Sequence, residues 1–333
     1  MMKRFPIILF LLTVMLNGQN FFPILGGQRV GTSVFTFLKI GVSGRAMGMG
    51  EAVVALNQDA GSLYYNPASI AQLKNTELIA TRISWPADIN YDFFSSVKHV
   101  NGPHYLGLMA GILHMAPMME TTEYYPHGTG NYFTFQDQFF GLAYSVRMTD
   151  RFSFGITVKH VQEELAGNTM SNVLLDMGTF YWTGYKSLRF SAALTHFGNQ
   201  TAPEGTYDKV VLDKDTGEEI LLTSTFTNFS PPTMFQVGAA MDVLTNDLTV
   251  VTFSTQLNHP VDNTEYIATG MEALILDVLY LRAGYKSNKD EENLSLGMGL
   301  QIKLGAMLFH VNYSYTNLIH LSDPVRLSIG VSF

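Results

Sequence analysis

Residues that could carry catalysis occur in this sequence, but their spacing does not match the common catalytic motifs. The run Gly41-Val42-Ser43-Gly44 does not complete the G-x-S-x-G pattern of a nucleophile elbow. Gly48 and Gly50 are followed by Val53, where a G-x-G-x-x-G dinucleotide fingerprint has its third glycine. The nine histidines include no pair at i and i+4 with a glutamate between them, so nothing supports a catalytic zinc site. We therefore assign no catalytic residue, no metal and no cofactor, and we predict a protein that is not an enzyme.

One acidic run, Asp213-Lys214-Asp215-Thr216-Gly217, is similar to the start of a calcium-binding loop. The acidic residue expected at the twelfth position is missing, because leucine and threonine occupy that neighbourhood. The flanking runs Val210-Val211-Leu212 and Ile220-Leu221-Leu222 are typical of strands, which favours a polar hairpin turn over an ion site. The edges of such a hairpin could bind a protein partner by strand addition.

Four charged residues alternate with apolar neighbours along expected strands: Glu272, Arg282, Lys303 and Arg326. We expect them to face a lumen, because a charge on the lipid face of a barrel costs about 2 to 4 kcal/mol at the bilayer midplane. Two interpretations follow. The charges either pair across strands in a hydrogen-bonded lumen, packed around a plug that the stretch 41–73 would form, or they line the path of a ligand.

Aromatic and methionine side chains gather between positions 118 and 135, among them Met118, Met119, Tyr124, Tyr125 and Phe133. The alternation places this patch at the outer end of a strand pair. Such residues commonly form a girdle at the lipid headgroups. A large exposed apolar patch can also be a docking surface for a partner or an entry site for a hydrophobic ligand.

The elements expected to position these residues are short alternating strands. Between positions 294 and 304, leucine, methionine and isoleucine occupy every second position while serine, glycine, glutamine and lysine occupy the others. Counting such runs from Thr76 onward gives about fourteen strands, and even numbers are the rule for bacterial single-chain barrels. We predict an all-β fold, a transmembrane antiparallel β-barrel with an N-terminal plug that is rich in glycine and short helices.

The connections between the expected strands alternate in length, as barrels with short periplasmic turns and long external loops do. Short turns are expected at Thr149-Asp150, at 183–186, at Asn246-Asp247 and near Gly305, and longer loops at 115–131, 200–231 and 287–293. The chain ends in an alternating strand whose last residue is Phe333. A terminal aromatic of this kind resembles the signal read by the barrel assembly machinery, which is an expected partner.

The stretch 41–73 is the least strand-like part of the chain. Small residues crowd its first half, so that its backbone can pack closely against other backbone. Asp59 is placed to cap a short helix over 60–65, and Pro67 can start another near Ala68 after Asn66. This pattern predicts a compact, bent plug.

The same stretch resembles the N-terminal signature of the PorV/PorQ family, which is related to the FadL fatty-acid channels. The matching runs are Phe37-Leu38-Lys39-Ile40-Gly41-Val42, Arg45-Ala46-Met47-Gly48-Met49-Gly50 and Tyr64-Tyr65-Asn66-Pro67-Ala68. Near the C-terminus, Leu281-Arg282-Ala283-Gly284-Tyr285-Lys286 and Leu294-Ser295-Leu296-Gly297-Met298-Gly299-Leu300 are also similar to that family. The chain departs from the family pattern at Glu51 and Ser69, where glycine is usual. The resemblance makes Arg45, Gly48, Gly50, Asn66, Pro67 and Ala68 the plug motif.

Composition and the N-terminus indicate an exported protein. Positions 1–18 resemble a signal peptide, with two basic residues before a short apolar run, so we expect 1–18 to be a signal peptide, 19–75 the N-terminal segment and plug, and 76–333 the barrel. The absence of cysteine excludes disulfides and a thiol nucleophile. The net charge of −8 argues against nucleic-acid binding, and charged residues make up only 14% of the chain. We expect a multi-pass protein of the bacterial outer membrane, in contact with its lipid.

Two functions follow from the resemblance. The PorV/PorQ likeness implies a part in type IX secretion, as a cargo-binding shuttle or attachment-complex component whose partners are the translocon and the C-terminal domains of cargo. The FadL likeness implies a passive channel for fatty acids or other hydrophobic compounds. A lateral opening for such a channel needs an interrupted wall strand, and Trp85-Pro86 and Pro231-Pro232 are the candidates, both expected at strand ends.

Overall fold

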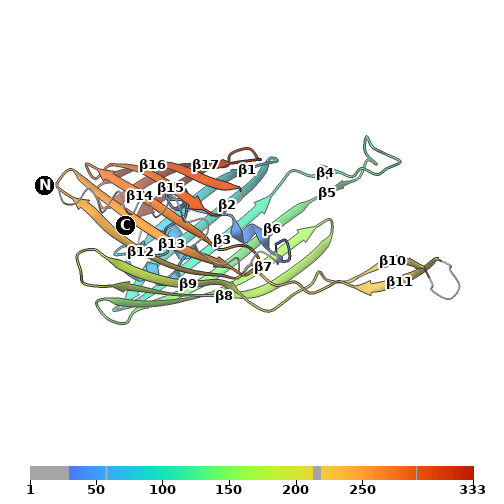
Figure 1. The fold of residues 1–333 in the computed structure, drawn as a ribbon, viewed down its shortest axis with the longest axis horizontal. Coiled ribbons are helices and arrows are strands. Elements are labelled where there is room, and N and C mark those ends of the chain that lie inside the picture. The colour runs from blue at the N-terminus through green and yellow to red at the C-terminus, as the bar shows by residue number, and fades with distance from the viewer. Residues whose placement is uncertain (1–29, 57–58, 213–218, 290) are drawn as a thin grey trace.

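A computed structural model describes residues 30–333 except 57–58, 213–218 and 290. Its main body is a closed antiparallel barrel of 14 strands in which each strand pairs with its neighbours along the chain and β1 closes the barrel against β18 (Figure 1). The wall strands are β1 (Glu77–Trp85), β2 (Ile89–Asn101), β3 (His104–His114), β6 (Phe135–Arg147), β7 (Phe152–Leu165), β8 (Asn168–Trp182), β9 (Arg189–Phe197), β12 (Met234–Thr245), β13 (Thr249–Pro260), β14 (Tyr266–Ile275), β15 (Leu279–Ser287), β16 (Glu292–Leu304), β17 (Met307–Leu318) and β18 (Val325–Ser332). The predicted barrel and its strand number are confirmed.

Alternation of side chains along each strand separates a lipid face from a lumen face. On β16 the side chains of Leu294, Leu296 and Met298 are about half exposed on the outside, while Ser295 is buried inside. A strand of period two places successive residues on opposite faces, so an outward apolar row brings a polar row into the lumen. Within the described residues, no helix is long and apolar enough to cross a membrane.

The two ends of the barrel differ in the length of their connections. Short turns join β2 to β3, β6 to β7, β8 to β9, β12 to β13, β14 to β15 and β16 to β17, and the chain also ends at this side. We call this side the turn end and the opposite side the loop end, because the connections of 115–134 and 198–233 leave from there. The predicted short turns and the long loops at 115–131 and 200–231 therefore lie at opposite ends as expected, but the loop expected at 287–293 is only the four-residue connection 288–291. At the turn end, Phe333 and Thr76 exchange two backbone hydrogen bonds of 3.0 and 3.1 Å.

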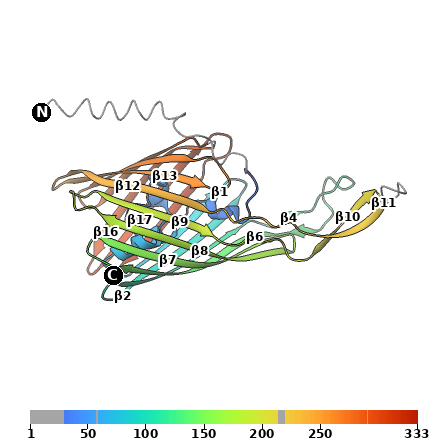
Figure 2. The ribbon, with the colours of Figure 1, turned by 60° about the horizontal axis from the view of Figure 1, so that its bottom comes forward.

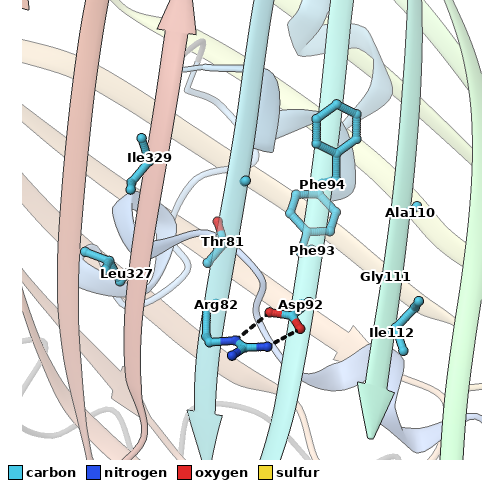
Figure 3. A pocket seen from close by; sticks show the side chains of 11 residues that line it. Thr81, Arg82, Asp92, Phe93, Phe94, Ala110, Gly111, Ile112, Leu327 and Ile329 are labelled. Atoms are coloured by element: carbon cyan, nitrogen blue, oxygen red, sulfur yellow. Dashed lines mark hydrogen bonds and ion pairs between the residues drawn. The ribbon is translucent and has the colours of Figure 1, made fainter.

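An ion pair lies on the outward face of the wall near the loop end. Arg82 on β1 donates to Asp92 on β2 through Nε to Oδ1 (2.7 Å) and Nη2 to Oδ2 (2.5 Å), and His114 on β3 lies 3.4 Å from the same carboxylate. Next to them, toward the turn end, an apolar groove of about 430 Å³ includes Phe94 and Ile329 (Figure 3). The polar cluster stands at the boundary where the apolar belt ends.

The plug lies inside the barrel and consists of short helical turns (Figure 1). Ser43, Asp59 and Asn66 cap three of these turns, each accepting a hydrogen bond from a backbone N–H of the first turn. The predicted cap at Asp59 is confirmed, and the turn expected near Ala68 begins at Pro67 with Asn66 as its cap, although both turns are 3₁₀ rather than α-helical. The turns are η3 (Thr36–Lys39), α2 (Gly44–Gly48), η4 (Ala60–Tyr64) and η5 (Pro67–Gln72).

Glycine lets the plug backbone touch the wall backbone. Gly50 has φ +62°, and a Cβ on Gly284 of β15 would lie 2.0 Å from the Gly50 nitrogen. A Cβ on Gly155 of β7 would likewise lie 2.4 Å from the carbonyl carbon of Pro67. No side chain fits at such distances, so glycine at positions 155 and 284 of the wall is a condition for the plug to seat. The buried core of the protein is this plug together with inward aromatic and aliphatic residues of the wall.

Two hairpin arms project from the loop end beyond the wall (Figures 1 and 2). The shorter contains β4 (Met118–Met119) and β5 (Tyr132–Phe133), and the longer contains β10 (Thr206–Leu212) and β11 (Glu219–Thr225). The second arm is the predicted hairpin, with Val210 opposite Leu221. The proposed calcium run at 213–217 lies outside the described residues, as does the expected signal peptide at 1–18.

Candidate functional site: a plugged lumen with a vestibule

The Asn66-Pro67-Ala68 motif docks the plug on β7 and β8. The side-chain nitrogen of Asn66 donates to the carbonyls of Val54 (2.9 Å) and of Thr179 on β8 (3.1 Å). Its Oδ1 accepts from the Ala68 backbone N–H at 2.9 Å, which caps the next turn. One buried amide therefore joins two plug segments to the wall and satisfies all but one of its hydrogen-bonding positions.

Arg45 of the plug meets two of the predicted lumen charges. Its guanidinium donates to Glu272 on β14 through Nε (2.8 Å) and Nη2 (2.6 Å). Arg282 on β15 donates to the same carboxylate at 2.6 Å and to Asn312 at 2.9 Å. A carboxylate held by two guanidiniums inside the lumen is a compensated buried charge rather than an open ligand site.

The other two predicted lumen charges lie elsewhere. Arg326 on β18 is fully buried and donates to the Gly41 carbonyl of the plug (2.8 Å) and to Thr316 (3.2 Å). Lys303 lies near the turn end of β16, where it is exposed and has no ion pair among the described residues. The structure thus brings Glu272 and Arg282 together, places Arg326 at a separate plug contact, and leaves Lys303 at the rim.

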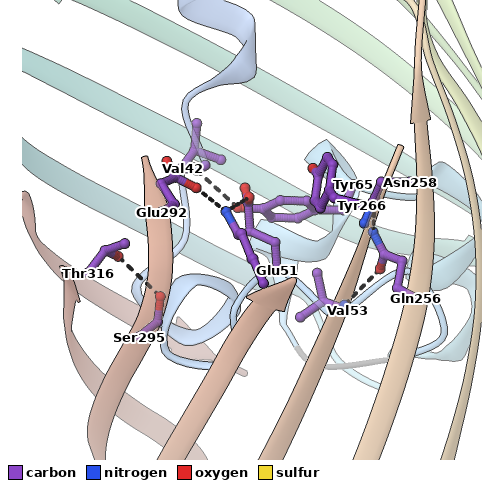
Figure 4. A network of polar contacts seen from close by, with 12 residues as sticks. Val42, Glu51, Val53, Tyr65, Gln256, Asn258, Tyr266, Glu292, Ser295 and Thr316 are labelled. Atoms are coloured by element: carbon purple, nitrogen blue, oxygen red, sulfur yellow. Dashed lines mark hydrogen bonds and ion pairs between the residues drawn. The ribbon is translucent and has the colours of Figure 1, made fainter. Parts of the chain in front are cut away.

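A second ionic contact fixes the plug near the loop end (Figure 4). Lys286 on β15 pairs with Glu51 of the plug (2.5 Å) and with Glu292 on β16. Gln256 on β13 accepts from the backbone N–H groups of Val53 (3.0 Å) and Val54 (2.9 Å). Glu51 stands at the position where the sequence resemblance leads us to expect glycine. Its backbone keeps a left-handed φ of +62°, as glycine would, while its side chain is used for the ion pair.

Across the lumen, three titratable groups of β7, β8 and β9 lie together beside the plug. The Lys159 ammonium is 2.6 Å from Asp176 and 3.2 Å from the His196 ring, and it lies 4.9 Å from the centre of the Tyr64 ring. His196 has φ +58° and lies at an irregularity in the β8–β9 pairing. Sequence reasoning missed this cluster, although the alternation of β7 and β8 already placed its lysine and aspartate on the lumen face.

A cavity of about 310 Å³ opens between the plug and the wall at the loop end, and we call it the vestibule. Its apolar lining is Phe37, Ile40, Trp85, Ile89, Leu113 and Phe135, and its polar lining is Thr36, Lys39, Asp137, Lys289 and Glu292. Lys39 also lines a second space of about 30 Å³, beside Tyr64 and His196. The lysine therefore stands between the vestibule and the interior, and its ammonium is held by Asp262.

The aromatic patch predicted between 118 and 135 stands on the shorter arm, away from the lumen. Tyr124 and Tyr125 are 89% and 62% exposed, and Met118, Met119 and Phe133 belong to the two-stranded part of the arm. Hydrogen bonds from Asn131 and Thr129 order the arm through Glu120 and lower the pKa of that carboxyl. The patch therefore belongs to a surface, and it does not line the vestibule.

No protein-family model and no curated protein sequence matches the chain. Several solved structures share its fold. The CymD monoaromatic hydrocarbon channel superposes with a TM-score of 0.59 at 14% identity, covering 88% of this chain and 97% of that one. The *Pseudomonas putida* toluene transporter TodX gives 0.58 at 13% identity over 88% and 97%. The fold is that of the FadL-like outer-membrane barrels.

A *Pseudomonas aeruginosa* FadL homologue is also similar, with a TM-score of 0.55 at 9% identity and coverage of 88% and 98%. At these identities the likeness concerns the fold. It supports the FadL-like part of the sequence resemblance, while the PorV/PorQ part stays a prediction.

Proposed function

We propose that this protein is a plugged outer-membrane channel for the passive uptake of small hydrophobic compounds, with the loop end at the cell surface. The observation that carries the proposal is the vestibule, an apolar cavity at the loop end whose floor is the plug itself. Ligand sites are typically apolar concavities with a few polar groups, and this one has that composition. The CymD channel and the TodX transporter, which share the fold, are described as acting on aromatic hydrocarbons.

Entry from the vestibule requires movement at Lys39. The vestibule and the smaller inner space meet at this side chain, which the Asp262 carboxylate holds in place. The Lys39 side chain is 30% exposed but that of Asp262 is only 3% exposed, so moving the lysine leaves a buried carboxylate and costs more than the about 0 to 1 kcal/mol of a surface ion pair. The plug contacts at Asn66 and Arg45 remain intact during such a step. Passage thus begins by a local shift of the segment before Gly41.

The exit route is constrained by the wall. Trp85 is the last residue of β1, and Pro231-Pro232 precede the first residue of β12, so neither proline site interrupts a wall strand. The interruption nearest the inner space is instead the irregular β8–β9 pairing beside His196. This position replaces the proline sites as the candidate for a sideways exit.

An uptake assay tests the proposal. Cells that express the barrel should accumulate radiolabelled toluene faster than cells with an empty vector. Leu113→Trp fills the vestibule from β3 and should lower the rate toward the vector level. Leu108→Trp, on the lipid face of the same strand, is the matched control and should leave uptake unchanged. Equal uptake by vector and wild-type cells would contradict the proposal.

A second candidate function is favoured by the arms. Val210 and Leu221 are 61% and 70% exposed on the longer arm, and Tyr124 is 89% exposed on the shorter one. Exposed apolar surface of this kind usually has a partner. The PorV/PorQ resemblance implies that the partner is secreted cargo or the type IX translocon. Gentle purification from native outer membrane, followed by mass spectrometry, tests this function, and a barrel without co-purifying proteins would count against it.

A further inference from the structure

The vestibule contains a buried carboxylate, one oxygen of which has no hydrogen-bond partner among the described residues. Asp137 lies on the lumen face of β6, its residue is 3% exposed, and its Oδ1 has no hydrogen-bond partner among the described residues. Its side chain lines the vestibule. Burying an unpaired carboxylate is costly. A ligand whose polar group donates a hydrogen bond to it would remove that cost, so the carboxylate can serve to recognise such a ligand.

The surroundings of Asp137 favour a cation. Glu163 on β7 is its direct neighbour across the strand pair, and it accepts one hydrogen bond, from the Phe35 backbone N–H at 3.0 Å. The basic residues of the vestibule are engaged elsewhere. Lys39 binds Asp262, and Lys289 lies 4.7 Å above the Tyr266 ring. Glu292, the other acidic residue of the lining, is held by Lys286.

The apolar part of the lining suits an organic cation as well. Phe37, Trp85 and Phe135 contribute aromatic rings to the same cavity. Ring faces attract cations, and the effect grows when the cation is removed from water. A carboxylate and aromatic rings in one cavity therefore stabilise the ammonium and the hydrocarbon of a single ligand together.

We propose that the vestibule selects hydrophobic amines, whose ammonium group donates to Asp137 while the hydrocarbon part packs on the aromatic lining. This inference rests on the proposed uptake function and names the substrate class for the same site. Hydrocarbons without a polar group can still pack on the aromatic lining, whereas the carboxylate of a fatty acid would be repelled by Asp137 and Glu163.

Binding to the purified barrel in amphipol tests the proposal. The chain has two tryptophans, so Trp182→Phe leaves Trp85 in the vestibule as the only tryptophan, whose fluorescence can be excited selectively. The probes are 4-phenylbutylamine, 4-phenylbutanol and 4-phenylbutyrate, which share a skeleton and differ in their polar group. The amine should bind about tenfold tighter than the alcohol, the size expected of one charge-assisted hydrogen bond. The acid should bind weakest.

Variants then locate the preference. Asp137→Asn should remove the advantage of the amine and leave the affinity for the alcohol unchanged. Lys289→Met removes the remaining cation and should tighten amine binding. Asp88→Asn is the matched control, an exposed aspartate in the turn between β1 and β2 whose left-handed φ of +58° asparagine accepts.

The outcomes separate this inference from the function on which it rests. Equal affinities for the three probes, or a preference for the acid in the wild-type barrel, would overturn amine selection while leaving the uptake function standing. Absence of binding by every probe would contradict the vestibule as a ligand site, and with it the proposed uptake. The wild-type comparison needs no variant to fold, so the inference stays testable even if Asp137→Asn is unstable.

Discussion

Single residues in this barrel show how a side-chain contact can offset backbone strain. Glu51 occupies a left-handed conformation that glycine adopts without strain, at φ +62°. A non-glycine residue there costs about 1 to 2 kcal/mol. The ion pair of Glu51 with Lys286, at 2.5 Å, offsets that cost because the lysine is buried and needs compensation. Glu51 therefore accepts backbone strain that glycine would avoid, and its side chain gains an ion pair that holds the plug to the wall.

This balance can be measured with two variants. Glu51→Gln keeps the strained backbone and loses the charge, so it should lower the stability of the folded barrel by about 1 to 3 kcal/mol. Glu51→Gly also loses the charge but relieves the strain, so it should be closer to wild type. Urea unfolding followed by tryptophan fluorescence gives the order. A glycine variant less stable than the glutamine variant would refute the strain argument.

Contacts between residues close in the sequence could be predicted from it, whereas contacts between distant residues could not. Asp59 and Asn66 were predictable as caps because each bonds a backbone N–H two residues away. The inward direction of Glu272 and Arg282 followed from strand alternation alone. The missing hydrogen bond at Asp137 could not be predicted from the sequence, because it depends on the positions of plug and wall residues around the carboxylate. The neighbours of Lys159 were also hidden, since His196 is 37 residues away.

At the scale of elements, the barrel wall and the plug follow different rules. Alternation and turn length determine the wall, and both are local features that the sequence displays. The plug is held by pairings between positions that are far apart, such as Arg45 with Glu272 across 227 residues. The reason for some of its glycines is seen only in the structure, where they face a glycine of the wall. This is why the number of strands was predictable and the seating of the plug was not.

The docking of η5 yields the prediction for this scale. Replacing Asn66 and Pro67 with alanine removes the three hydrogen bonds of the Asn66 amide and the preset start of the turn. An N-cap alone contributes about 0.5 to 2 kcal/mol, so the plug should loosen and small-solute leakage should rise. Conductance in planar bilayers measures the effect. Asn75→Ala is the control, because Asn75 bonds Ser332 outside the plug. Unchanged conductance in the double variant would argue against a sealing role for this motif.

At the scale of the whole molecule, the barrel and its arms are separable. The strands β10 and β11 pair with each other and with no wall strand, so the longer arm adds little to the closed ladder. The vestibule, in contrast, is lined by residues of the plug, of β3 and β6, and of other wall strands where these reach the loop end. The two candidate functions therefore use different parts of one molecule, uptake using the vestibule and protein binding using the arms.

Removing the longer arm discriminates between them. A chain in which residues 206–225 are replaced by a short Gly-Ser linker should fold with an unchanged thermal midpoint, because no barrel hydrogen bond is lost. Migration of heated and unheated samples on denaturing gels checks that the barrel has closed. Uptake of toluene should then equal that of the wild type, whereas loss of co-purifying proteins would assign a docking role to the arm. A fall in uptake with an intact barrel would instead mean that substrates reach the vestibule along this arm, whose exposed Val210 and Leu221 would be the first contacts.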